Sequence, residues 1–256
     1  MPTISIAIQK GGSGKTTTAI NLSAAWQLMG KKVLLIDLDP QANCTQALGY
    51  ENEQERSIHQ LLKAEAAGQL VPLDQIIKEE KDIDFIPSSW SLASAELEFA
   101  GVYGREGLLQ AVLEPLQSLY DYIVIDCPPS MGLLTVNALA ASDMVMMPMQ
   151  AEFLPLQGVQ SFWQHCENLR KKINPNLSLL GFVLTQFDSR KNMTKSTIEK
   201  LSELYPDKLF STRIRRNVAL VEAQQKGVDI FTFDKNSNGA KDYMALAEEA
   251  LGRING

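Results

Sequence analysis

The sequence has few of the residues that disulfide bonds, metal clusters and membrane spans require. Its 256 residues include only three cysteines and two histidines. Cys44, Cys127 and Cys166 form no CxxC pair, which excludes a disulfide framework and fits a reducing compartment such as the cytoplasm. His59 and His165 have no second potential ligand at helical spacing, so neither indicates a metal site. No uninterrupted apolar run approaches the roughly 20 residues of a membrane-spanning helix.

Positive charge is also scarce over the chain as a whole. The net charge is −6, so the average composition is not that of a basic nucleic-acid-binding protein. Hydrophobic residues make up 45% of the chain, which is enough for a sizeable core. The N-terminus enters an apolar segment at once, so we expect no signal peptide. The length fits a single domain over residues 1–256.

A glycine-rich loop near the N-terminus organises the rest of the chain. The loop Lys10–Thr17 reads K-G-G-S-G-K-T-T and lies between an apolar segment, Ile4–Ile8, and a predicted helix over residues 18–26. Glycines let backbone N–H groups converge on an anion, and a helix N-terminus adds partial positive charge. The pattern predicts a phosphate-binding loop in which Lys15 reaches the β- and γ-phosphates and Thr16 coordinates Mg²⁺.

Acidic residues end two of the predicted buried strands. Val33–Asp37 is followed by Leu38 and Asp39, and Tyr122–Asp126 ends in a single acid, as in a Walker B strand. Because ligands bind at the carboxyl ends of parallel strands, these acids are expected beside the phosphate loop. Asp126 is predicted to hold Mg²⁺, through a water molecule. Apolar strands that alternate with helices predict an α/β fold with a mostly parallel sheet and helices on both faces.

Further elements follow from hydrophobic periodicity and turn residues. We expect short strands at residues 83–87, 143–148 and 178–185. Helices are predicted at residues 57–67, 73–80, 92–99, 107–119, 132–141, 156–173 and 239–251.

One segment reverses the acidic balance of the chain. Residues 186–217 contain eight basic and four acidic residues. A confined basic surface on an acidic protein indicates contact with phosphate backbones rather than base-specific reading. An ordinary solvated helix face remains the alternative.

Three motifs together resemble a known family. The loop has Gln9 where common P-loops have glycine, and it carries the second lysine, Lys10, as in the deviant Walker A loops of the ParA/MinD ATPases. The D-x-D-P-Q sequence from Asp37 to Gln41 resembles the second acidic motif of ParA proteins. Residues 215–223 resemble the ParA segment P-R-N-V-R-L-S-E-A, with Arg215 in place of the proline and Ala219 in place of an arginine. The resemblance to ParA/Soj partition ATPases, of the P-loop NTPase fold, covers nearly the whole chain.

The resemblance implies roles for individual residues. Lys10, Lys15 and Asp39 would be catalytic: Lys10 would contact the nucleotide of a second protomer, and Asp39 would position the attacking water. The metal ligands would be Thr16, Asp37 and Asp126. The nucleotide-binding set would be Lys10, Gly11, Gly12, Ser13, Gly14, Lys15, Thr16, Thr17 and, near the adenine, Asn217. The expected DNA-binding residues are Arg190, Lys191, Lys195, Arg213, Arg215 and Arg216.

The resemblance also implies a function. It predicts a slow, switch-type ATPase that uses ATP and Mg²⁺, forms an ATP-dependent sandwich homodimer and binds double-stranded DNA nonspecifically. A ParB-type partner would stimulate hydrolysis during chromosome or plasmid partition, and the protein would be cytoplasmic and nucleoid-associated. Because the chain starts at the first strand, we expect no separate N-terminal DNA-reading domain.

Other members of this fold suggest alternatives. A ParA-like ATPase that positions a protein cargo on the nucleoid would have the same nucleotide motifs. A MinD-type membrane-associated division-site regulator needs a basic amphipathic C-terminal helix, whereas Ala245–Leu251 is acidic and small, so we expect no membrane binding. A reductase with a bridging iron–sulfur cluster needs a suitable cysteine pair, which the positions of the three cysteines do not provide.

Overall fold

The computed structural model describes residues 1–51, 56–78, 83–150, 156–188 and 192–256. Over this part of the chain, seven strands form one sheet in the order β3-β2-β4-β1-β5-β6-β7, and every neighbouring pair of these strands is parallel. The strands are β1 (Thr3–Ile6), β2 (Val33–Asp37), β3 (Asp84–Ile86), β4 (Tyr122–Asp126), β5 (Met144–Gln150), β6 (Ser178–Phe187) and β7 (Leu209–Arg215). This parallel α/β sheet confirms the predicted fold class.

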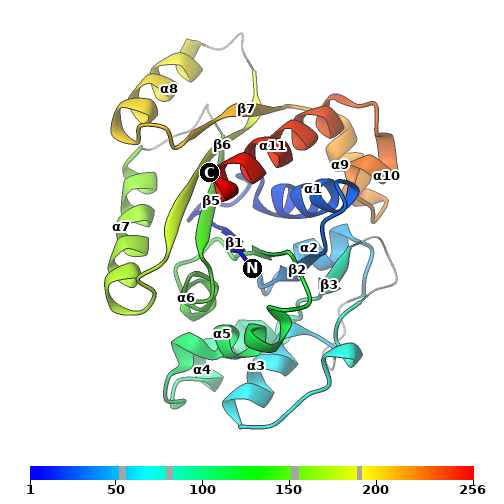
Figure 1. The fold of residues 1–256 in the computed structure, drawn as a ribbon, viewed down its shortest axis with the longest axis vertical. Coiled ribbons are helices and arrows are strands. Elements are labelled where there is room, and N and C mark those ends of the chain that lie inside the picture. Colours follow the sequence, from blue (N-terminus) through cyan, green and yellow to red (C-terminus); the bar gives the residue numbers. More distant parts are fainter. Residues whose placement is uncertain (52–55, 79–82, 151–155, 189–191) are drawn as a thin grey trace.

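Helices connect the strands and lie on both faces of the sheet (Figure 1). The α-helices are α1 (Lys15–Leu28), α2 (Asn43–Ala47), α3 (Ile58–Ala66), α4 (Ala95–Glu98), α5 (Leu108–Leu113), α6 (Leu133–Ala140), α7 (Leu156–Lys172), α8 (Asn192–Leu204), α9 (Val218–Gln225), α10 (Ile230–Asp234) and α11 (Asn238–Asn255). Short 3-10 turns are η1 (Leu73–Gln75), η2 (Trp90–Ser94), η3 (Arg105–Gly107) and η4 (Glu114–Leu116). None of the helices described is long and apolar enough to cross a membrane.

The central strands are buried on both faces and supply two separate cores. In β2, Leu34 and Ile36 belong to the core beneath α3, α5, α6 and α7, whereas Val33 and Leu35 belong to the core beneath α1 and α11. This division follows from the two-residue period of a strand, which sends successive side chains to opposite faces. Continuous apolar runs such as V-L-L-I are therefore the sequence pattern of a strand covered on both sides.

The helix that follows the phosphate loop is fixed by the C-terminal helix. Figure 1 shows α1 beside α11, and the two helices are in contact. Trp26 is fully buried, and its Nε1 donates a hydrogen bond to the carbonyl O of Ala247 at 3.0 Å. The hydroxyls of Thr18 and Tyr243 are 3.2 Å apart, closer to the loop. The start of α1 is thus held in place by residues from the far end of the sequence.

Two predicted helices differ from those observed. Over residues 73–80, only the η1 turn forms in the described part, and the backbone of Lys78 exchanges two hydrogen bonds with Phe85. That pairing with the start of β3 uses the backbone groups that a longer helix would need. In residues 107–119, α5 ends at Leu113 because Pro115 has no N–H to donate to the preceding turn. Hydrophobic periodicity also did not predict β7, an edge strand within the basic segment.

Candidate functional site

The phosphate loop lies at the carboxyl end of β1, and its last three residues, from Lys15, form the first turn of α1. Gly12 and Gly14 have φ values of 70° and 90°, in the left-handed region that disfavours other residues. A Cβ atom at Gly14 would also lie 3.3 Å from Cγ2 of Thr185. Residues 11–17, which include the first residues of α1, border one cavity. A helix N-terminus has unpaired N–H groups, and such groups bind phosphates in proteins.

Two neighbouring strands hold the loop in this shape. The hydroxyl of Thr185, near the end of β6, donates a hydrogen bond to the carbonyl O of Ser13 at 2.8 Å. Nε2 of Gln150, the last residue of β5, donates to the carbonyl O of Gly12. These contacts direct the carbonyl groups of Gly12 and Ser13 toward β5 and β6. Neither residue was predicted, because nothing local in the sequence connects it to the loop.

Lys15 is one of the residues that line this cavity, whereas Lys10 is not among them. The side chain of Lys15 is buried, with 7% of the residue exposed, and its Nζ donates to the carbonyl O of Lys10 at 3.2 Å. Lys10 itself is half-buried. A bound phosphate would offer Lys15 a charged acceptor in place of this neutral carbonyl, and charge-assisted hydrogen bonds are about twice as strong.

Two carboxylates lie side by side at the ends of β2 and β4. Asp37 and Asp126 are register partners in the sheet, and both are fully buried. Oδ2 of Asp126 accepts a 2.7 Å hydrogen bond from the hydroxyl of Thr16. Oδ1 of Asp126 is buried without a hydrogen-bond partner among the described residues. An unpaired buried carboxylate oxygen is costly, so this atom fits a cation ligand better than a structural role.

Both oxygens of the second carboxylate, Asp37, accept hydrogen bonds from residues that follow β2. Oδ2 of Asp37 accepts from the backbone N–H and the hydroxyl of Thr45, at 2.9 and 2.7 Å. Oδ1 of Asp37 accepts from the backbone N–H of Asp39 at 3.1 Å. Thr45 in turn accepts from the backbone N–H of Ser88 at 2.9 Å, which connects β2 to the segment after β3. Asp37 thus orders the loop that carries Asp39.

Burial disfavours negative charge at this pair. Burial raises the pKa of Asp37 to about 7, although the hydrogen bonds from Thr45 act in the opposite direction. The pKa of Asp126 is raised by burial and then by the charge of Asp37, against the hydrogen bond from Thr16 and the charge of Lys15. A divalent cation beside Asp126 would favour the ionised forms of both acids.

Asp39 occupies a tight turn at the edge of the cavity. Its Oδ1 accepts from the backbone N–H of Gln41 at 3.0 Å, and its carbonyl O accepts from the Ser88 hydroxyl at 2.6 Å. The turn includes Ala42 with φ of 52°, an unusual value for a residue other than glycine. Both Asp39 and Gln41 line the same cavity as the phosphate loop. The carboxylate is therefore held where it can face a group bound to the loop.

Two adjoining cavities follow the phosphate loop toward α9. The first has a volume of about 680 Å³ and is lined by residues 11–17, Asp39, Gln224 and others. The second, about 310 Å³, is lined by Arg216, Asn217, Tyr243 and neighbouring residues. The residues that line both are Gly14, Thr17, Gln186 and Val221. The sizes and the shared wall suit an extended ligand with a phosphate part and a less polar part.

Asn217 lies at the wall of the smaller cavity and begins α9. Its Oδ1 caps the helix by accepting from the backbone N–H of Ala219 at 2.9 Å. Only the Nδ2 group of this side chain is left to donate to a ligand. An adenine ring carries nitrogen acceptors that such a donor could contact, so the geometry is compatible with the predicted role.

The predicted DNA-binding residues differ in their exposure to solvent and in their ion pairing. Arg215 is bound to Asp242 of α11 through Nη2 at 2.6 Å and Nε at 2.9 Å. Arg213 is half-buried, and burial lowers the pKa of its guanidinium. Arg216 is exposed. Lys195 lies on α8, and Arg190 and Lys191 lie outside the described residues. Arg216 is thus the most available of the three arginines on β7 and the turn after it.

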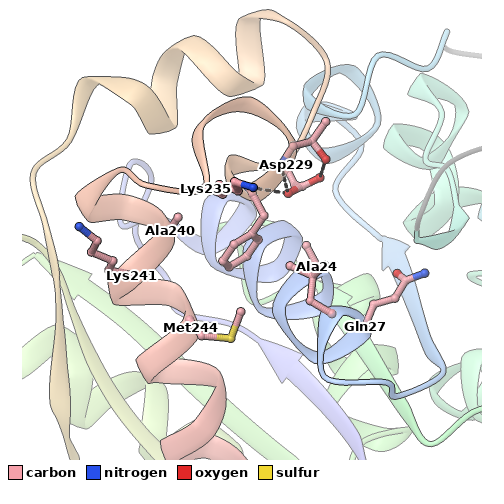
Figure 2. A pocket seen from close by; sticks show the side chains of 10 residues that line it. Ala24, Gln27, Asp229, Lys235, Ala240, Lys241 and Met244 are labelled. Atoms are coloured by element: carbon pink, nitrogen blue, oxygen red, sulfur yellow. Dashed lines mark hydrogen bonds between the residues drawn. The ribbon is translucent and has the colours of Figure 1, made fainter.

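A third cavity, of about 510 Å³, lies between α1, α10 and α11 (Figure 2). Ala24 of α1 and Met244 of α11 contribute to its walls. Asp229 is occupied as the N-cap of α10, where it accepts from the backbone N–H groups of Phe231 and Thr232. None of the predicted site residues lines this cavity. It is separate from the two cavities at the phosphate loop.

Comparisons with known proteins agree with this geometry. The AAA domain family model matches residues 1–179. The chain is 42% identical over 249 residues to the sporulation initiation inhibitor protein Soj of Bacillus subtilis, covering 96% of each chain. It is 37% identical to the chromosome partitioning protein ParA of Myxococcus xanthus, over 98% of this chain and 88% of the relative. A solved structure of cobyrinic acid a,c-diamide synthase from Mycobacterium smegmatis, with a bound ATP analogue and magnesium, superposes with a TM-score of 0.83 at 32% identity, covering 99% of this chain and 95% of that one.

Proposed function

This chain belongs to the family of ParA/Soj-type partition ATPases, and from that premise we propose that it is an ATP-dependent switch that binds DNA nonspecifically and drives DNA partition. In the proposed cycle, ATP supports a sandwich homodimer that binds duplex DNA, and hydrolysis releases it. A ParB-type activator accelerates a slow intrinsic hydrolysis, so that the lifetime of the DNA-bound state is timed. The protein then works at the nucleoid.

The nucleotide part of this proposal rests on Oδ1 of Asp126, which is buried beside Thr16 and has no hydrogen-bond partner in the described part of the chain. A hydroxyl and a carboxylate oxygen are the ligand types that Mg²⁺ takes at nucleotide sites, where phosphates and waters complete its shell. Asp37 supports them from the neighbouring strand. Bound there, Mg²⁺ would supply positive charge to the β- and γ-phosphates.

The residues around this site have separate tasks in hydrolysis. The loop N–H groups and Lys15 bind the phosphates and stabilise the charge that develops during transfer. Asp39 orients a water molecule whose oxygen bonds to the γ-phosphorus as the bond to the bridging oxygen of ADP breaks. Lys10 contacts the nucleotide of the second protomer, which makes hydrolysis depend on dimerisation. Asn217 contacts the adenine.

DNA contact is assigned to basic residues of the segment 186–217, among them Arg216, Arg213 and Lys195. Eight basic against four acidic residues in residues 186–217 support a contact with phosphate groups. Because Arg215 is bound to Asp242, it contributes less than Arg216 in this proposal.

The test measures binding to a nonspecific DNA duplex without nucleotide, with ADP and with ATP, at two salt concentrations. We expect tight binding only with ATP and a steep loss at the higher salt concentration. Asp39→Ala should bind ATP and stay on DNA, because hydrolysis no longer ends that state. An equal DNA affinity without nucleotide, with ADP and with ATP would contradict the proposed switch. Normal ATP hydrolysis by Asp39→Ala would contradict the role proposed for Asp39.

Other outcomes would point to other members of the family. ATP-dependent dimers that do not bind DNA would favour an ATPase that acts on a protein or a membrane surface. ATP turnover that requires cobyrinic acid would favour the activity for which the solved structural neighbour is named.

A further inference from the structure

A side chain from the far end of the sequence reaches the phosphate loop. Nε2 of Gln224, on α9, donates a hydrogen bond to the hydroxyl oxygen of Thr17 at 3.0 Å. Gln224 is half-buried and lines the larger cavity together with the loop. The neighbouring Gln225 lines the same cavity but is exposed. The contact lies inside the site, although no motif in the sequence includes Gln224.

Thr17 occupies the junction of the two cavities. It lines both the phosphate cavity and the smaller cavity that contains Asn217. In a nucleotide that extends through both, the α-phosphate joins the nucleoside to the other phosphates. A residue at the junction is therefore the natural contact of the α-phosphate.

The direction of this hydrogen bond fixes the Thr17 hydroxyl. The Nε2 group of an amide can only donate, so Thr17 must accept from Gln224 with a lone pair. Its own proton must then point elsewhere. A phosphate oxygen at the junction is an anionic acceptor for that proton, and hydrogen bonds to charged acceptors are the stronger ones.

Both ends of helix α9 make contacts that hold the helix beside the loop. Asn217 caps its first turn. After its last turn, Gly227 has φ of 71°, and a Cβ there would lie 2.8 Å from the Cα of Gly49. This close backbone approach joins the end of α9 to the residues that follow α2. Gln224 therefore projects from an element that is anchored at both ends.

We propose that Gln224 is a positioning residue for the nucleotide, which orients the Thr17 hydroxyl so that it donates to the α-phosphate. The inference rests on the proposed function, since it requires ATP in these cavities. It adds a residue outside the phosphate loop to the set that determines affinity. Because ATP and ADP share the α-phosphate, the effect of Gln224 must be the same for both.

The test compares Gln224→Met, which keeps the length but removes the donor, with Gln160→Met at an exposed position of α7 as a matched control. We expect Gln224→Met to raise the Kd of both ATP and ADP about fivefold, the effect of one lost hydrogen bond. The kcat at saturating ATP should change less than about twofold, because the interaction is equal in the ground and transition states. Gln224→Glu should raise both Kd values further, since a carboxylate accepts the Thr17 proton and repels the phosphate. Gln160→Met should leave Kd unchanged.

A double-mutant cycle with Thr17→Ala separates positioning from general stability. If Gln224 acts through the hydroxyl, Gln224→Met should have no further effect on Kd in the Thr17→Ala background. Additive effects, or an unchanged Kd in Gln224→Met while the wild type binds ATP, would overturn the inference alone. Failure of the wild type to bind ATP would instead contradict the proposed function.

Discussion

The hydroxyl of Thr16 donates a 2.7 Å hydrogen bond to Oδ2 of Asp126, joining the phosphate loop to the end of β4. The other oxygen of that carboxylate is buried and unpaired among the described residues. One oxygen of the Asp126 carboxylate is thus hydrogen-bonded by the protein, and the other is available to a ligand. We therefore expect a substitution of Asp126 to change stability and nucleotide binding in opposite directions.

Asp126→Asn should stabilise the metal-free protein while it weakens nucleotide binding. Burial and the charge of Asp37 raise the pKa of Asp126 in the folded state. At a pH between the unfolded-state pKa and the folded-state pKa of Asp126, the native protein binds more protons than the unfolded chain. The free energy of unfolding therefore falls as pH rises through that range. At pH 8 in EDTA, we expect the variant to have a Tm about 3 °C higher. With Mg²⁺, its Kd for ATP should be at least about tenfold higher, and an unchanged Kd would contradict the metal assignment.

Arg215 and Arg216 should respond differently to alanine substitution. Arg215 is paired with Asp242, so Arg215→Ala should lower the Tm by about 2–4 °C and change DNA affinity less than about twofold. Arg216 is exposed, so Arg216→Ala should weaken ATP-dependent DNA binding about three- to tenfold and reduce the salt slope by about one. Fluorescence anisotropy with labelled DNA at several salt concentrations measures the DNA affinity and the salt slope of each variant. Equal losses of DNA affinity in the two variants would refute the distinction.

Glu249→Gln should destabilise the protein at neutral pH but not in acid. Glu249 accepts from the backbone N–H groups of Ser211 and Thr212 at 2.7 and 2.8 Å, which covers the edge strand β7. Burial acts to raise the pKa of Glu249, but these hydrogen bonds outweigh it and lower the pKa to about 2. Its contribution is therefore complete above the unfolded pKa of about 4.3 and is lost as pH falls through 2.

Thermal unfolding as a function of pH measures this effect. At pH 7, we expect Glu249→Gln to have a Tm about 3–6 °C lower than the wild type, and the difference should disappear near pH 2. The exposed Glu248→Gln is the matched control and should leave the Tm unchanged. A Tm difference for Glu249→Gln that stays constant down to pH 2 would show that its charge is not the cause.

Gly181→Ala should destabilise the fold without touching the nucleotide cavities. Gly181 lies at an irregularity in the β5–β6 pairing, with φ of 155°, and a Cβ there would lie 2.8 Å from the Phe210 ring and against the carbonyl O of Lys208. The overlap with backbone should cost about 3 kcal/mol in the free energy of unfolding. Gly101→Ala meets nothing within 4 Å and should be neutral in the same denaturation experiment.

The sequence predicted best the elements whose pattern is local. β2 occupies the residues expected for it, Val33–Asp37, because a continuous apolar run that ends in an acid has a clear start and stop. β7 was missed because its sequence, L-F-S-T-R-I-R, is that of a half-exposed edge strand. The predicted helix over residues 73–80 was wrong in the described part because the backbone of Lys78 pairs with that of Phe85. This tertiary contact outweighs the local helix propensity.

The same division applies to the site. Lys15, Thr16 and Asp126 could be named from motifs, since phosphate and metal chemistry restricts residue types at fixed spacing. Thr45, Gln150 and Gln224 could not, because each supports the site through a hydrogen bond to a residue on another element. The roles predicted for Lys15, Thr16 and Asp126, like those of Lys10 and the DNA-binding arginines, stay predictions.

The order of the strands also bears on how the chain acquires its structure during synthesis. β1 is the fourth strand of the sheet, and its two neighbours are β4 and β5, so Thr3 pairs with Ile123 and Ile4 with Met144. The first strand of the sheet to be synthesised therefore has no partner in the sheet until nearly half of the chain has followed. Pairings of such sequence separation form slowly and leave apolar strands exposed to aggregation. The phosphate loop, attached to that strand, can take its final shape only late in the folding of a nascent chain.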